Sequence, residues 1–400
     1  MRILTFTTLY PSAARPQHGI FVETRLTKLV QTGAVAARIM APCPWFPFDA
    51  PWFGRYAAFA RIPRRETRQG LIVDHPRYPV VPKLGVSTAP LVLSGAVLRL
   101  LRSEIRGDGD FDLIDAHYFY PDGAAAVLLG LALGRPVVVT ARGSDLNILP
   151  QHPIRRLWIR WAARQADGLI TVSTGLRQRL IELGIAGERV LVLRNGVDLA
   201  RFRPYDRAAA RQALGLTRPT LLAVGNLVPL KRHTLMVEAM TRLPEFDLII
   251  VGEGPERAAI ENAARRRGVA ERVRLFGAVP QDRLPQLYSA ADLLVLVSTH
   301  EGWPNVLLES MACGTPVVVS ETGGVAEIVG AVEAGRIVAD ITPDRLAEAI
   351  RDFSARLPPR AATRRYAEQF DWRSTTEGQI TLFREVLDRR AARLAGPRVA

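Results

Sequence analysis

The sequence predicts an α/β protein made of two doubly wound, Rossmann-like domains. Short runs rich in Val, Ile and Leu alternate with amphipathic helical segments along the whole chain, which is typical of parallel sheets covered by helices on both faces. The chain has 400 residues, more than one domain usually contains, and 48% of them are hydrophobic. Two separate hydrophobic cores are therefore expected.

The expected strands fall into two series. In the first half of the chain they cover residues 2–6, 37–41, 71–74, 112–116, 136–140, 169–172 and 190–193. In the second half they cover residues 220–224, 248–251, 273–276, 293–297, 316–319 and 336–338. We place the first domain at residues 1–200 and the second at residues 201–372. Because such sheets bind ligands beyond the carboxyl ends of their strands, two facing domains would enclose a cleft.

The net charge of +14 is concentrated in the N-terminal half. The first 200 residues carry 25 basic and 15 acidic side chains, which predicts an anionic partner for this half. RNA recognition modules need aromatic side chains interleaved on a sheet, and no such pattern occurs here. Nucleic acid is therefore not an expected partner.

The two cysteines, Cys43 and Cys313, are isolated and lack metal-ligand spacing. No metal site or cofactor is expected, and a reducing compartment fits. The N-terminal apolar run is too short for a signal peptide. The apolar stretch at residues 123–134 is shorter than the ~20 residues of a membrane span. We expect a cytoplasmic protein that can lie at the inner face of the cell membrane.

The stretch at residues 298–318 combines features of a nucleotide-sugar site. Asn305 is the expected N-cap of a short helix that follows an apolar strand. The start of that helix, including Val306, offers N–H groups to a diphosphate. Glu309 could accept hydrogen bonds from a ribose diol, and Glu301 could bind sugar hydroxyls. Two glutamates eight residues apart would carry no weight without the surrounding residues.

This stretch resembles the signature of family-4 glycosyltransferases with the GT-B fold. In that family the two glutamates contact the nucleotide-sugar donor. The resemblance implies a retaining, metal-independent transferase that uses a UDP- or GDP-sugar. It also implies that a C-terminal helix at residues 373–394 completes the first domain, after two helices that begin near residue 343. The implied catalytic residues are His117, Lys231 and Glu301, and Lys231 would bind the donor diphosphate.

The resemblance assigns further residues to the donor site. Gly19, at a helix start, would lie beside the diphosphate or the sugar, and His117, at a strand end, would contact the sugar or the reaction centre in the cleft. Asn226 stands where the family commonly has Arg, and Arg232 is the nearest substitute in sequence. Backbone groups near Gly277 and Val279 would meet the base.

The acceptor side is expected in the N-terminal half. Residues 140–145 resemble the family's Thr-x-His-Gly-x-Asp pattern with Arg142 in place of His, and Arg142 and Asp145 are guesses for acceptor binding. Trp45 and Trp52 belong to an aromatic, Pro-rich segment that fits either a binding surface or a loop packed on the core. The helix at residues 154–164 fits either a lipid-facing helix or a core helix with a solvated Arg face. The expected acceptor is an anionic saccharide of a bacterial surface polysaccharide, either free or lipid-linked.

Two other functions remain open at this point. A sugar-nucleotide epimerase could share the fold, because fold alone does not determine chemistry. A non-catalytic basic protein that binds membrane surfaces would also explain the positive charge.

Overall fold

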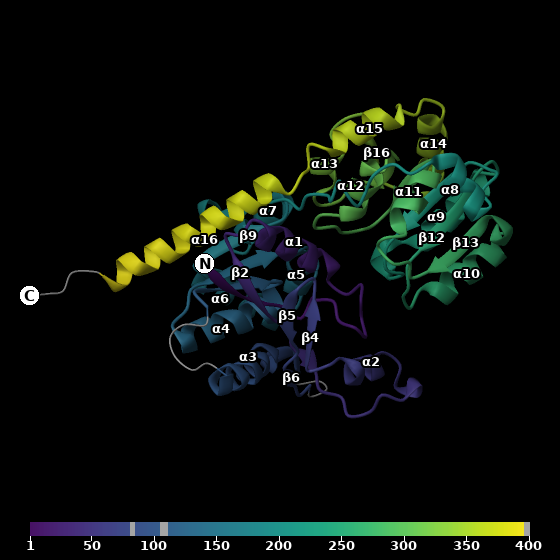
Figure 1. The fold of residues 1–400 in the computed structure, drawn as a ribbon. Helices are drawn as coiled ribbons and strands as arrows, with labels where there is room; N and C mark the ends of the chain where they lie inside the picture. The colour runs from purple at the N-terminus through teal and green to yellow at the C-terminus, as the bar shows by residue number, and fades with distance from the viewer. Residues whose placement is uncertain (81–84, 105–110, 396–400) are drawn as a thin grey trace, which may run out of the picture. The chain divides into compact units, whose positions relative to one another are not determined.

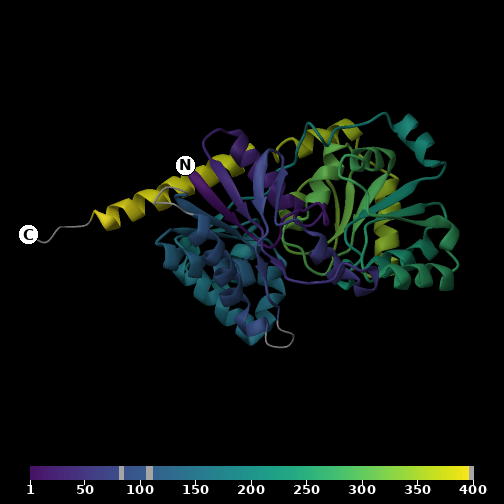
Figure 2. The same ribbon diagram turned by 60° about the horizontal axis from the view of Figure 1, so that its bottom comes forward.

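The computed structural model describes residues 1–80, 85–104 and 111–395, which form two compact units. Unit 1 consists of residues 1–194 together with the segment that begins at Arg373, and unit 2 consists of residues 195–372. Each unit contains a parallel or mainly parallel sheet covered by helices (Figure 1, Figure 2). The predicted class of two Rossmann-like α/β domains is therefore confirmed.

Unit 1 is built on an eight-stranded sheet in the order β10-β9-β8-β7-β1-β2-β5-β4. Its parallel strands are β1 (Arg2–Phe6), β2 (Ala36–Met40), β5 (Leu71–Asp74), β7 (Leu113–His117), β8 (Val137–Ala141), β9 (Gly168–Thr171) and β10 (Val190–Val192). Every residue of β7 and β8 is buried, as expected for central strands covered on both faces. The strand order reverses between β1 and β7, which places a topological switch point there.

The helices of unit 1 form two groups. Helices α3, α4 and α6 pack together, and α1 packs on α16 (Figure 1). The helices are α1 (Ile20–Gln31), α2 (Arg55–Arg61), α3 (Gly85–Glu104), α4 (Ala124–Leu133), α5 (Ser144–Asn147), α6 (Pro153–Gln165), α7 (Thr174–Glu182) and α16 (Arg373–Leu394). Helix α16 buries Ile380, Phe383 and Val386 in the same core as strand residues of β8 and β9, so the C-terminal segment is an integral part of this unit.

Unit 2 has a six-stranded parallel sheet in the order β13-β12-β11-β14-β15-β16. The strands are β11 (Thr220–Val224), β12 (Asp247–Val251), β13 (Val273–Gly277), β14 (Leu293–Leu296), β15 (Val317–Ser320) and β16 (Gly335–Val338). The helices are α8 (Arg207–Leu214), α9 (His233–Ala239), α10 (Arg257–Arg266), α11 (Leu284–Ala290), α12 (Asn305–Ala312), α13 (Val325–Ile328), α14 (Pro343–Ser354) and α15 (Arg360–Ala367). The switch point of this sheet lies between β11 and β14.

Some local features differ from the predictions. Asn305 is the first residue of α12, and Pro304 occupies the N-cap position without a side-chain cap. The short strands β3 (Cys43–Pro44), β4 (Arg65–Arg68) and β6 (Arg77–Tyr78) were not predicted. Strand β4, with the sequence Arg-Glu-Thr-Arg, pairs antiparallel with β5 at the sheet edge. Because it contains no apolar residue, it lacks the hydrophobic pattern on which strand prediction depends.

The two aromatic segments of unit 1 differ in exposure. Trp45 and Trp52 are 58% and 81% exposed, so the segment at residues 42–63 presents both rings to solvent. On α6, in contrast, Trp158 donates a hydrogen bond to the carbonyl oxygen of Ser87, and its ring lies 5.4 Å from that of Trp161. The two Trp rings of α6 therefore pack on neighbouring groups of unit 1. The arginines of this helix differ, because Arg156 and Arg164 are exposed whereas Arg155 and Arg160 are half-buried. No helix among the described residues is long and apolar enough to cross a membrane.

Candidate active site

An ion pair lies at the switch point of unit 2. Lys231 ends a short 3-10 helix (Pro229–Lys231) beyond β11, and Glu301 lies in the loop beyond β14. The Lys231 Nζ atom is 2.6 Å from Glu301 Oε1, and the two side chains are only 18% and 11% exposed. The amide of Thr299 also donates to the carbonyl of Leu230 at 2.9 Å. A backbone hydrogen bond and an ion pair thus join the two loops.

Glycines let the surrounding loops approach one another closely. A Cβ atom on Gly252 would lie 1.9 Å from the carbonyl oxygen of Gly225. A Cβ on Gly323, which has a φ of +47°, would lie 1.9 Å from the carbonyl oxygen of Glu301. No other residue fits at these positions without moving the backbone. The backbone can therefore pass close to Glu301 and to the end of β11 because glycine occupies these two positions.

Three neighbours of Lys231 have different environments. Asn226 is exposed on the loop beyond β11. Arg232 donates from Nε to the carbonyl oxygen of Val297 at 2.7 Å, so part of its guanidinium is used to hold the end of β14. His233 is buried, and burial lowers its pKa to about 4, with the Lys231 charge acting in the same direction. Lys231 is consequently flanked by a neutral ring and a partly engaged arginine.

The start of α12 carries Asn305 and Val306. The first N–H groups of a helix have no partner within it, and both residues are half-buried. The Asn305 side-chain oxygen accepts a hydrogen bond from Asn195 Nδ2 at 3.2 Å. One turn further, Glu309 Oε2 accepts from the Tyr288 hydroxyl at 2.8 Å. Burial raises the pKa of Glu309 to about 7, although the bond from Tyr288 and the charge of Arg201 act against this shift.

Tyr288 was missed by sequence analysis. It lies on α11, whose apolar pattern predicts only a core residue, and its ring is fully buried. Its hydroxyl orients the Glu309 carboxyl group through the hydrogen bond to Oε2. No sequence motif identifies Tyr288. Gly277 ends β13 with a φ of +73°, and Val279 is half-buried in the loop that follows.

In unit 1, His117 is held inside a polar cluster at the end of β7. The ring is 1% exposed, so it does not open directly to solvent at the strand end. Arg142 Nη2 lies 2.6 Å from His117 Nδ1, and Asp115 Oδ2 lies 3.2 Å from Nε2. Since arginine can only donate, Nδ1 accepts and Nε2 carries the proton that faces Asp115. Burial lowers the pKa of His117 to about 4, Asp115 acting against the shift and Arg142 with it.

Asp145 binds backbone amides, and Gly19 allows two backbone segments to approach closely. The Asp145 carboxylate accepts hydrogen bonds from the amides of Arg142, Gly143 and Phe119 at 2.7–3.0 Å, and it is fully buried. A Cβ on Gly19 would lie 2.3 Å from the carbonyl of Leu9. Asp145 is therefore not an exposed acceptor contact in this structure, and the burial of Arg142 beside His117 leaves only 9% of it exposed.

Sequence analysis also missed Asp122. Its carboxylate accepts hydrogen bonds from the amide of Thr8 at 2.6 Å and from the hydroxyls of Thr7 and Thr8. Burial raises the pKa of Asp122 to about 7, although these hydrogen bonds favour its ionised form. Because Asp122 follows β7 and Thr8 follows β1, these bonds join the two strand ends at the switch point of unit 1.

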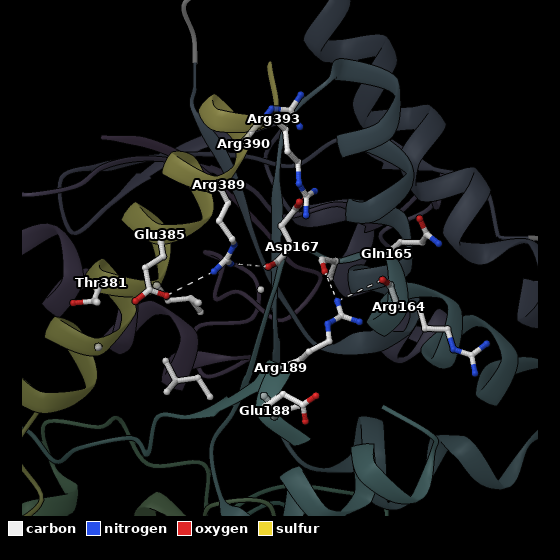
Figure 3. Close-up of a pocket in the computed structure, with 16 residues that line it drawn as sticks. Arg164, Gln165, Asp167, Glu188, Arg189, Thr381, Glu385, Arg389, Arg390 and Arg393 are labelled. Atoms are coloured by element: carbon white, nitrogen blue, oxygen red, sulfur yellow. Dashed lines mark hydrogen bonds and ion pairs between the residues drawn. The ribbon is translucent and has the colours of Figure 1, made fainter. Parts of the chain in front are cut away.

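A cavity of about 800 Å³ lies at the amino-terminal edge of the unit 1 sheet, away from the end of β7, near which His117 and Asp122 lie (Figure 3). Its walls come from the starts of β9 and β10 and from α16. Arg189 donates to the carbonyl of Ala166 at 2.9 Å, and Arg389 donates to the carbonyl of Asp167 at 3.2 Å. Arg389 thus joins α16 to the backbone that precedes β9, and Arg189 joins the start of β10 to the same backbone.

Two protein-family models match this chain. The family model described as "Glycosyl transferases group 1" matches residues 206–370, and that described as "Glycosyltransferase Family 4" matches residues 55–201. The Bacillus subtilis protein TuaC, named for teichuronic acid biosynthesis, is 30% identical over 82% of this chain and 83% of its own length. This chain belongs to glycosyltransferase family 4.

Further relatives of this glycosyltransferase include the D-inositol 3-phosphate glycosyltransferase of Mycolicibacterium gilvum, which is 32% identical over 76% of the chain and 73% of the relative. The structure of Anabaena HepE in complex with UDP-glucose has a TM-score of 0.70 at 21% identity, covering 95% of the chain and 98% of HepE. This structural likeness shows the GT-B fold. The prediction of a glycosyltransferase is thereby confirmed over the epimerase and the non-catalytic binding protein.

Proposed function

We propose that this glycosyltransferase is a retaining, metal-independent enzyme. It transfers a sugar from a UDP- or GDP-sugar to a saccharide or lipid-linked acceptor in cell-surface polysaccharide synthesis. The main structural support for this donor site is the Lys231–Glu301 ion pair at the switch point of unit 2. The UDP-glucose complex of HepE and the teichuronic acid role in the name of TuaC support the substrate classes.

The proposed roles follow from the chemistry of each group. Lys231 and the N–H groups at the start of α12 bind the diphosphate, because both present positive charge or donors. Glu309 accepts from the ribose diol, and Glu301 accepts from hydroxyls of the transferred sugar. As the sugar bond breaks, the diphosphate gains negative charge, and fixed cations and dipoles there lower the barrier. The acceptor attacks from the face of the departing diphosphate, and a diphosphate oxygen takes the acceptor proton.

Unit 1 supplies the acceptor side in this proposal. His117 is neutral and fixed by Arg142 and Asp115, so it can donate from Nε2 to a sugar oxygen only if the cluster rearranges. The sequence predicts the domain boundary at residue 200, and the two compact units divide six residues earlier, after Arg194. We therefore propose catalytic domains of residues 1–194 with the C-terminal helix 373–394, and of residues 195–372.

Calorimetric binding of UDP, GDP and ADP tests the donor site. We expect either UDP or GDP to bind selectively. Glu309→Ala should weaken that binding about 10- to 100-fold, because the carboxyl group that accepts from the ribose diol is lost. The matched control is Glu348→Ala, at an exposed position of α14, which should bind like wild type. Absence of binding by all three nucleotides, or an unchanged affinity in Glu309→Ala, would count against this donor site.

We also propose that the exposed aromatic segment contacts an anionic membrane. Trp45, Phe48 and Trp52 are all more than half exposed, and amphipathic aromatic rings favour the lipid interface. The positive charge of the N-terminal half adds attraction to anionic lipid.

Vesicle sedimentation tests this contact. Vesicles containing phosphatidylglycerol should pellet the protein, whereas pure phosphatidylcholine vesicles should pellet little of it. Trp52→Ser should lower the binding about tenfold, since a buried aromatic ring contributes strongly to partitioning. Tyr205→Ser, at an exposed site in unit 2, is the control. Equal binding by Trp52→Ser and wild type would show that this segment does not face lipid.

A further inference from the structure

A small cavity opens beside the switch point of unit 1, and we name it the Arg15 cavity. It is lined by the loop after β1 (residues 8–18), the turn after β2 (residues 41–44) and residues of the 59–78 region, Phe59 and Tyr78 among them. Its volume of about 190 Å³ is smaller than that of a site for a whole ligand. It can therefore hold one ring or one charged group of a larger substrate.

Two residues that line the Arg15 cavity, Tyr10 and Ser12, carry buried hydroxyl groups. Tyr10 and Ser12 are 3% and 2% exposed. Among the described residues, neither the Tyr10 hydroxyl nor the Ser12 hydroxyl has a hydrogen-bond partner. Buried polar groups in native proteins are nearly always satisfied, and leaving one unpaired is costly. Two such groups in one cavity point to a ligand that supplies the missing partners.

The Arg15 cavity has a fixed cation in its wall. His18 Nε2 lies 3.1 Å from the carbonyl oxygen of Thr8, so this nitrogen carries the proton, and Nδ1 accepts from Arg15 Nη2 at 3.0 Å. Burial and the charge of Arg15 lower the pKa of His18 to about 4. The imidazole is therefore a neutral support that holds the guanidinium in place.

No carboxylate offsets this charge in the cavity wall. The lining contains neither Asp nor Glu, and Arg15 forms no ion pair with a carboxylate of the described residues. The carboxylate of Glu66, on β4, does not line the cavity and is bonded to the amide of Ala13 at 3.1 Å and to the ring of His75 at 2.8 Å. An anion beside Arg15 would therefore meet one positive charge and the Ser12 hydroxyl. Burial raises the pKa of Tyr10, and the charges of Glu23 and Glu66 act in the same direction, so the Tyr10 hydroxyl would serve as a donor to the guest.

The remaining walls suit a polyol ring. The Arg15 guanidinium lies 5.3 Å from the centre of the Phe59 ring, and stacking on an aromatic face restricts its orientation. Phe59 and Tyr78 are half-buried, and both line the cavity. Apolar C–H faces of a sugar pack on such rings, while its oxygens reach Tyr10 and Ser12.

We propose that the Arg15 cavity binds a carboxylate or phosphate carried by a polyol ring of the acceptor. The assignment to the acceptor rests on the proposed glycosyltransfer, whereas the anion site stands on its own contacts. Arg15 would pair with the anion, and the Tyr10 and Ser12 hydroxyls would bond to its oxygens or to those of the ring.

Ligand-observed NMR titrations of the full-length protein test this proposal. The probes are D-glucuronate against D-glucose, for a carboxylate, and myo-inositol 1-phosphate against myo-inositol, for a phosphate. At least one anionic probe should bind about tenfold or more tightly than its neutral counterpart, because a charge-assisted hydrogen bond is gained. The probe that shows this difference identifies the source of the anion.

Variants then assign the binding to the cavity. Arg15→Gln should abolish the preference for the anion, and Tyr10→Phe and Ser12→Ala should each weaken binding about threefold to tenfold, as expected for one hydrogen bond. Arg179→Gln, an exposed arginine of α7, is the control and should bind like wild type. UDP affinity, measured in parallel, should be unchanged in all variants, which shows that they are folded.

Two results would overturn the proposal. One is equal binding of the anionic and neutral probes by wild type. The other is an unchanged preference in Arg15→Gln while UDP binding is retained. If no nucleotide binds wild type but an anionic probe binds in an Arg15-dependent way, the proposed donor site fails and the anion site is supported.

Discussion

Replacing Lys231 by methionine or Glu301 by glutamine should lower kcat for sugar transfer by about 10²- to 10³-fold, the loss typical when one preorganised electrostatic group is removed. Lys231 Nζ has three N–H donors, and Glu301 uses one at 2.6 Å. In the proposed donor complex, the diphosphate accepts a hydrogen bond from a second N–H group of Lys231. Both side chains are largely shielded from water, which strengthens their interactions with developing charge.

The double variant Lys231→Met/Glu301→Gln separates catalysis from folding. Each single variant leaves a partly buried charge without its partner and should reduce the free energy of unfolding by about 1–3 kcal/mol. The double variant should regain most of that stability, but its kcat should stay low. Thermal unfolding and initial rates of transfer measure the two quantities. Glu238→Gln, which breaks the exposed Arg267–Glu238 pair, is the control for both.

Activity within twofold of wild type in either single variant would contradict the donor assignment. Recovery of kcat in the double variant would show that the ion pair serves folding alone.

Replacing Phe383 by alanine should reduce the stability of unit 1 by about 3–5 kcal/mol, the usual cost of deleting a buried phenylalanine ring. Phe383 is fully buried and belongs to a core shared with Val138 of β8 and Ile170 of β9. It is brought there by α16, the last helix of the chain. Because the ring is enclosed by strands from the middle of the unit, its loss leaves a cavity that the surroundings fill only in part.

Amide hydrogen exchange measures this effect separately in each unit, which a single unfolding curve of a two-unit protein does not. In Phe383→Ala, protection in β8 and β9 should fall more than about 100-fold, while protection in β14 and β15 should stay constant. Leu394→Ala, on the same helix but 78% exposed, should change stability by less than about 0.5 kcal/mol. Equal protection of β8 in Phe383→Ala and wild type would show that α16 does not stabilise this sheet.

The sequence by itself determined the features that depend on local pattern. Apolar runs predicted the central strands of both sheets to within one or two residues, because strands buried on both faces have a continuous hydrophobic signal. The alternation with helices then implied parallel sheets and placed Lys231 and Glu301 beyond strand ends. The strand at residues 65–68 was not predicted, because its four residues are polar or charged and give no hydrophobic signal.

Only the tertiary structure decided which side chains meet. Glu309 was marked by its motif, but its partner Tyr288 comes from a helix with no polar signal, and their 2.8 Å bond accompanies a pKa of about 7. Asp145 was a guess for acceptor binding, and in this structure its buried carboxylate accepts hydrogen bonds from three backbone amides.

Long-range contacts are the reason for this difference. Gln379 of α16 donates to Asp115 at 3.3 Å across 264 positions of the chain, and Arg142 reaches His117 from the next strand. Periodicity reports which face of an element is buried, but not which distant residue lies opposite it. Sheet order and helix packing bring those residues together, and so the charge, protonation and hydrogen bonding of the site depend on the folded protein.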